Sequence, residues 1–203
     1  MKKFIWTMAA SVLVLLAIGL APVFSQEGGE EAPPEDPWTK LHTPGDEHKW
    51  LAEEEGTWEI SGKMWNAGPD GKPVEVAVTG SARLKMLFDR YLTEEMKITL
   101  GDTGVEMKMI GLIGYDNSAR EFSAMYVGNM GTGMHVFTGQ RSDENKVLTL
   151  SAEYVEKGLG DMKIKERIKN TRKSKDEVLL EMWGSYGDMP EMKMMEVTYK
   201  RKK

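Results

Sequence analysis

Two glutamates stand where the pattern of the chain calls for apolar side chains, and they are the first candidates for chemistry. Glu94 lies two residues after Leu92, and Glu166 lies two residues before Ile168. Residues two apart in a strand share one face, so both carboxyl groups are predicted to point into the interior. A carboxyl group held there can orient the polar head of a ligand or transfer a proton. A bulge that turns them to solvent, or a structural pairing with Arg83 or Tyr115, remains the alternative.

Methionine and histidine form the second candidate group. The chain has 16 methionines, and Met130 and Met134 lie close in sequence to His135. Thioethers with an imidazole are ligands that suit Cu(I). Flexible methionines also line cores and apolar cavities, and strand alternation accounts for their positions without a metal. We therefore expect no metal and no cofactor, and we expect Met134 and His135 to contact a ligand.

Aromatic residues in the predicted strands complete the expected binding set. Tyr115, Tyr126 and Trp183 are predicted to line the core or a cavity rather than to form a stacking platform for nucleic acid. The formal net charge of −5 also makes nucleic acid a poor partner. The chain has no cysteine, no glycine-rich phosphate loop between a strand and a helix, and no G-x-S-x-G sequence.

The N-terminal region predicts export. Residues 1–25 combine a short basic start, an apolar run and a cleavage-like end, as in a secretory signal peptide. Residues 26–42 are acidic and rich in proline and glycine, which predicts a disordered linker. The domain is expected at 43–203, in the periplasm or outside the cell, with membrane contact only through the signal segment before cleavage.

The elements that must position these residues follow from periodicity. A short helix is predicted to begin at Thr43-Pro44 and to end at Gly56, after which a period of two continues to the end of the chain. Turn residues divide this region into about ten strands. They lie near 57–66, 73–88, 90–100, 105–115, 120–128, 132–140, 146–155, 161–172, 177–187 and 192–201. Consecutive hairpins predict an up-and-down antiparallel barrel, wide enough for an internal cavity.

Several short motifs resemble a known family. These are His48-Lys49-Trp50-Leu51, Gly56-Thr57-Trp58-Glu59, Gly114-Tyr115-Asp116-Asn117, Gly131-Thr132-Gly133 and Val197-Thr198-Tyr199-Lys200-Arg201-Lys202. Their order and spacing are similar to those of the bacterial domain of unknown function 1579. The resemblance implies a lipocalin-like, or calycin, barrel and supplies no reaction. Because some calycin-like barrels hold haem through a histidine, haem handling at His135 is an alternative.

Together these observations predict an all-β binding module for a small, mainly apolar molecule. An enzyme that uses Glu94 and Glu166 for acid/base chemistry is one alternative, and metal or haem handling through Met134 and His135 is another. A filled barrel that acts through its surface is the fourth possibility. The ligand and the oligomeric state do not follow from the sequence.

Overall fold

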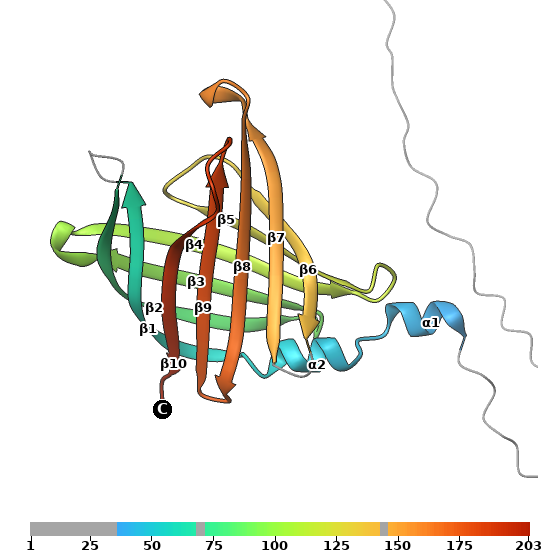
Figure 1. The fold of residues 1–203 in the computed structure, drawn as a ribbon. Coiled ribbons are helices and arrows are strands. Elements are labelled where there is room, and N and C mark those ends of the chain that lie inside the picture. The colour runs from blue at the N-terminus through green and yellow to red at the C-terminus, as the bar shows by residue number, and fades with distance from the viewer. Residues whose placement is uncertain (1–35, 68–71, 143–145) are drawn as a thin grey trace, which may run out of the picture. The chain divides into compact units, whose positions relative to one another are not determined.

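The fold is a closed antiparallel barrel of ten strands in the computed structural model, which describes residues 36–67, 72–142 and 146–203. The strands follow one another around the barrel in sequence order, and β1 closes it by pairing with β10 (Figure 1). They are β1 (Gly56–Ala67), β2 (Pro73–Leu87), β3 (Tyr91–Leu100), β4 (Val105–Asp116), β5 (Glu121–Gly128), β6 (His135–Ser142), β7 (Val147–Glu156), β8 (Met162–Ser174), β9 (Glu177–Tyr186) and β10 (Met192–Arg201). The predicted up-and-down barrel is therefore confirmed.

Two short helices precede the barrel, α1 (Pro37–His42) and α2 (Asp46–Ala52), and two single 3-10 turns lie at Gly101–Thr103 and Lys157–Leu159. The predicted helix corresponds to α2, but its N-cap is Gly45 rather than Thr43. Helix α1 lies within the segment predicted to be disordered. It can form there because the Asp36 side chain caps its N-terminus and Pro37 occupies its first turn. Residues 37–42 of the predicted linker thus form a helix, and the predicted signal peptide and the linker up to residue 35 lie outside the described residues.

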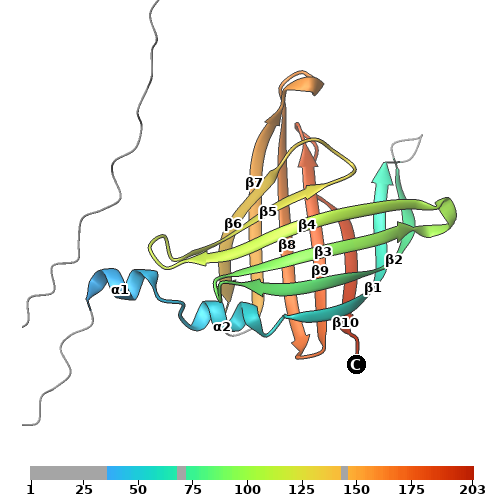
Figure 2. The same ribbon diagram turned by 180° about the vertical axis from the view of Figure 1, so that it is seen from behind.

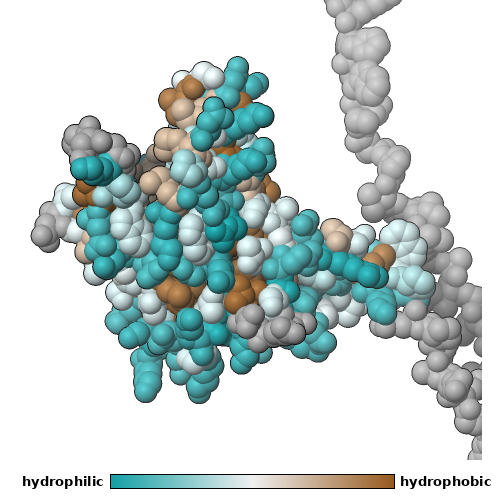
Figure 3. Space-filling model, viewed as in Figure 1, coloured by the Kyte–Doolittle hydropathy of each residue, from teal (hydrophilic) through white to brown (hydrophobic). Residues whose placement is uncertain are grey.

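Alternation along the strands places the core inside the barrel. Trp58, Ile60, Val78 and Ile98 are each at most 2% exposed, and exposed residues such as Glu59, Thr79 and Lys97 stand beside them in the strands. The space-filling view shows an outer surface that is mostly hydrophilic, with small hydrophobic patches (Figure 3). The strand predicted near 73–88 ends one residue earlier, at Leu87, because Phe88 has a φ of 56° and lies in the β2–β3 turn, where its side chain is exposed.

Helix α2 crosses one end of the barrel and closes it (Figures 1 and 2). Leu51 is buried, and Trp50 packs edge-on against Phe122 of β5, with ring centroids 5.8 Å apart. The Arg172 side chain from β8 donates to Glu53, to Glu54 and to the Trp50 carbonyl, and its guanidinium lies 4.2 Å from the Trp50 ring centroid. The apolar contacts and these charged bonds together hold the helix as a plug.

Candidate functional site

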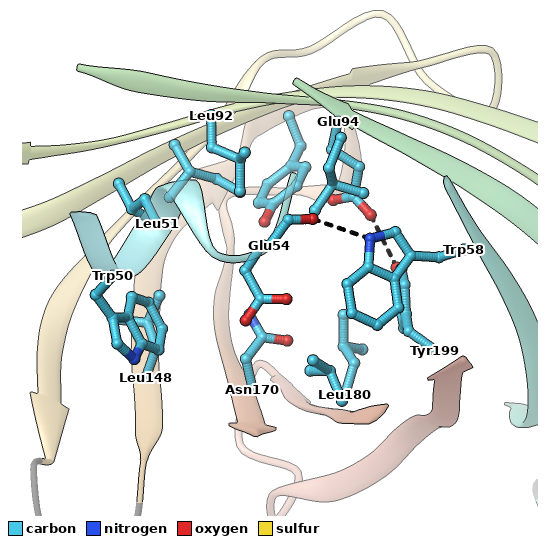
Figure 4. A pocket seen from close by; sticks show the side chains of 14 residues that line it. Trp50, Leu51, Glu54, Trp58, Leu92, Glu94, Leu148, Asn170, Leu180 and Tyr199 are labelled. Atoms are coloured by element: carbon cyan, nitrogen blue, oxygen red, sulfur yellow. Dashed lines mark hydrogen bonds between the residues drawn. The ribbon is translucent and has the colours of Figure 1, made fainter. Parts of the chain in front are cut away.

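The barrel contains two cavities of very different size. The smaller one, of about 60 Å³, lies directly above α2, and Trp50, Leu51, Glu54 and Trp58 are among its lining residues (Figure 4). The larger one has a volume of about 470 Å³, within the range usual for small-molecule sites. Four residues line both cavities: Glu94, Tyr126, Leu180 and Tyr199. These four side chains form the floor of the large cavity.

Methionine dominates the wall of the large cavity. Eight methionines line it, contributed by β1, β3, β4, β9, β10 and the β5–β6 loop: Met64, Met96, Met107, Met109, Met130, Met182, Met194 and Met195. Phe137, Ile168 and Leu180 add further apolar surface. Because thioether side chains are flexible and polarizable, such a wall adapts to apolar molecules of different shapes.

Glu94 is the buried acid of the cavity floor. It is only 8% exposed, and its Oε1 accepts a hydrogen bond of 3.0 Å from the Tyr199 hydroxyl, as Figure 4 shows. Burial raises the pKa of Glu94 to about 6; the Tyr199 hydrogen bond opposes this shift, and the charge of Glu54 adds to it. The predicted inward orientation is confirmed, and the partner is Tyr199 instead of Arg83 or Tyr115.

Tyr126 lies beside Glu94 because a glycine separates them in the sheet. Gly111 of β4 pairs with Glu94 of β3 on one side and with Tyr126 of β5 on the other. A Cβ atom at Gly111 would lie 2.7 Å from the Tyr126 ring, so the ring covers the glycine. Burial, with the nearby Glu94 carboxylate, raises the pKa of the Tyr126 hydroxyl, which therefore stays protonated and available as a donor.

Glu166 forms a second polar group higher in the same cavity. It is 8% exposed, its Oε2 lies 3.5 Å from His135 Nδ1, and the His135 ring meets Tyr154 edge-on at 5.0 Å. Burial raises the pKa of Glu166, while His135 and the Tyr154 hydroxyl oppose the shift. The prediction that Glu166 points inward is confirmed, and its carboxylate interacts with His135 and Tyr154.

Four of the predicted ligand contacts line the large cavity: Glu94, Tyr126, His135 and Glu166. The other three lie outside the lining of this cavity. Tyr115 lies at the closed end, where its ring packs against His48 and Phe122. Met134 is 68% exposed and lies outside the cavity lining. Trp183 does not line the cavity either; the Arg167 guanidinium lies 4.1 Å from its ring centroid.

The described part of the chain holds no group of three or more His, Cys, Asp or Glu side chains that could bind a metal ion. Among the same residues, no helix is long and apolar enough to span a membrane. The site is an apolar chamber with two separated carboxyl groups. Such groups can accept hydrogen bonds, pair with a cation or exchange a proton.

Sequence reasoning missed Tyr199 and Gly111 as parts of the site. The alternation in β10 places Tyr199 on the same face as Val197 and Met195, so its inward direction was readable from the pattern. Its contact with Glu94 could not be predicted from the pattern, because 105 residues separate the two in the sequence. The sequence shows that methionine is abundant, but only closure of the barrel brings these side chains around one chamber.

The fold and the cavity define a closed ten-stranded β-barrel with an apolar, methionine-lined chamber plugged at one end. The chain belongs to the family described as protein of unknown function (DUF1579), whose model matches residues 43–201. The family resemblance seen in the sequence is thus confirmed. No curated protein matches the chain.

The chain resembles solved structures at low sequence identity. The crystal structure of Rv2717c from M. tuberculosis is 14% identical, with a TM-score of 0.54, over 79% of this chain and 100% of its own. A redesigned beta barrel, mFAP1, bound to DFHBI, is 15% identical, with a TM-score of 0.39, over 74% of this chain and 97% of its own. At these identities the likeness to Rv2717c shows the fold alone.

Proposed function

We propose that this protein binds a small, mainly apolar molecule inside the barrel. The observation that carries the proposal is the 470 Å³ chamber, whose wall is built from eight methionines and whose polar groups are few. A large apolar pocket with a few fixed polar groups is the usual form of a ligand site. A barrel that only needed to fill its interior would not leave a chamber of this size unpacked.

A neutral fluorescent apolar probe, N-phenyl-1-naphthylamine, tests the proposal. We expect its fluorescence to rise on titration with the purified protein and to saturate. Met182→Trp should block the chamber, because Met182 faces inward opposite Met195 and Ile168. The matched control is Leu179→Trp, which places the same ring on the other face of β9.

The two variants separate internal binding from surface adsorption. If the probe binds inside, Met182→Trp weakens binding by about tenfold or more and Leu179→Trp changes it little. Circular dichroism and thermal melting establish that both variants fold. Equal binding by folded Met182→Trp and wild-type protein would overturn the proposal, as would a wild-type protein that binds no probe.

We further propose that the protein is exported, with residues 1–25 removed as a signal peptide. The support is the basic start, the apolar run and the cleavage-like residues at Val23-Phe24-Ser25. N-terminal sequencing of protein recovered from the periplasm or the medium should give a chain that begins at Gln26. Recovery of the uncleaved chain from the cytoplasm would contradict it.

A further inference from the structure

The charges that face the chamber are of one sign. Two carboxyl groups, those of Glu94 and Glu166, line it, and the lining residues that the structure describes include no lysine and no arginine. His135 is the one basic side chain among them. Lys163, Lys165, Arg167 and Lys169 of β8 lie on the opposite parity from Glu166, and Lys165 makes its ion pair with Glu153 on the outer face. Arg172 shares the parity of Glu166, but it pairs with Glu53 and Glu54 at the closed end. The interior therefore favours a positively charged guest over a negatively charged one.

The two carboxyl groups differ in the side-chain partners that they already have. Glu166 faces His135, with 3.5 Å between Oε2 and Nδ1, and also Tyr154. Glu94 accepts one hydrogen bond, at Oε1 from Tyr199, and no donor within the described residues reaches its second oxygen. The Tyr126 hydroxyl beside it likewise has no hydrogen-bond partner in the described part of the chain. Both side chains are at least nine-tenths buried and line the chamber.

Resting on the proposed function, we infer that the ligand is an apolar amine whose protonated nitrogen binds the free oxygen of Glu94. An ammonium group there donates a charge-assisted hydrogen bond to a carboxylate that is otherwise half satisfied. Tyr126 and Tyr199 line the chamber beside the same carboxylate. The apolar part of the ligand then lies among the methionines toward Met109 and Met194. A ligand that carries a carboxylate would instead meet a like charge.

The interaction should depend on pH in a defined direction. The groups that face Glu94 are Tyr199 from β10, Tyr126 from β5 and Glu54 from the turn after α2, and burial raises the pKa of Glu94 to about 6. An alkylamine remains protonated well above neutral pH, like a lysine side chain. Amine affinity should therefore increase as the pH rises from about 5 to about 8, because Glu94 loses its proton over this range. Alcohol affinity should change much less.

Three ligands that differ only in the head group test the inference: decylamine, decanol and decanoic acid, each measured by displacement of N-phenyl-1-naphthylamine at about pH 7.5. We expect decylamine to bind about tenfold more tightly than decanol, as a charged hydrogen bond implies, and decanoate to bind most weakly. Glu94→Gln should remove the advantage of the amine and its pH dependence. The control Glu153→Gln alters an exposed carboxylate on the outer face and should preserve both.

The outcomes separate this inference from the proposed function. If all three compounds displace the probe with equal affinity, or decanoate binds best, the apolar chamber stands and the amine preference is refuted. If Glu166→Gln removes the preference and folded Glu94→Gln retains it, the assignment to Glu94 is wrong. If neither the probe nor any of the three compounds binds, the proposed function itself is refuted.

Discussion

Replacement of Glu94 by glutamine should change the pH dependence of stability by a predictable amount. Burial raises the pKa of Glu94 from 4.5 to about 6 in the folded protein. Below pH 4.5 the side chain is protonated in both the folded and the unfolded state, so it adds no pH dependence. Between pH 4.5 and about pH 6 this carboxyl group is deprotonated in the unfolded chain but still protonated in the folded protein, so the free energy of unfolding falls as the pH rises. The total loss is about 2 kcal/mol, reached above the folded-state pKa.

Glutamine resembles the protonated carboxyl group and does not titrate, so Glu94→Gln removes this loss. Urea unfolding of both proteins at about pH 4 and about pH 8 gives two differences in the free energy of unfolding. We expect the variant to gain about 2 kcal/mol relative to wild type on going from the lower to the higher pH. The raised carboxyl group of Glu166 cancels in the comparison because both proteins contain it. A difference that is the same at the two pH values would refute the reasoning.

Two further substitutions probe the plug and the cavity floor. Arg172→Met should lower the free energy of unfolding by about 3 kcal/mol in urea titrations, because it leaves the buried Glu54 carboxylate unpaired. Arg167→Met, which removes a more exposed ion pair from the same strand, should cost about 1 kcal/mol or less, and equal losses would contradict the assigned role of the plug. Gly111→Ala should lower the melting temperature, at a cost of about 1–3 kcal/mol, since its Cβ would lie 2.7 Å from the Tyr126 ring. Gly131→Ala meets no atom within 4 Å and is the control; a stable Gly111→Ala would argue against the close packing.

The sequence predicted much of this structure because local alternation decides which face of a strand is buried. Glu94 and Glu166 could be assigned to the interior from their immediate neighbours, and both are buried. The alternation does not hold as far as Phe88, because a left-handed turn conformation ends the strand there and leaves the side chain exposed.

Contacts that cross the barrel could not be read in the same way. Glu94 and Tyr199 lie on β3 and β10, which are not neighbours in the sheet, so only the closed barrel brings them together. Met134 adjoins His135 in sequence, yet it lies in the loop before β6 and remains exposed while His135 enters the strand and lines the chamber. Proximity in sequence was therefore a poor guide to the membership of the site.

The pairing of β1 with β10 has a consequence for how the chain reaches its folded state. The first strand can form its hairpin with β2 early, but its other edge pairs only with β10, which ends at Arg201. Until the last strand is made, both outer edges of the growing sheet carry unpaired backbone groups, and such edges readily pair with other chains. Arg201 then donates to the Glu53 and Glu55 carbonyls and lies 4.1 Å from the Trp58 ring centroid, so the end of the chain secures the start of the barrel. A chain that lacks its final strand therefore loses closure and the Tyr199 side of the cavity floor in one step.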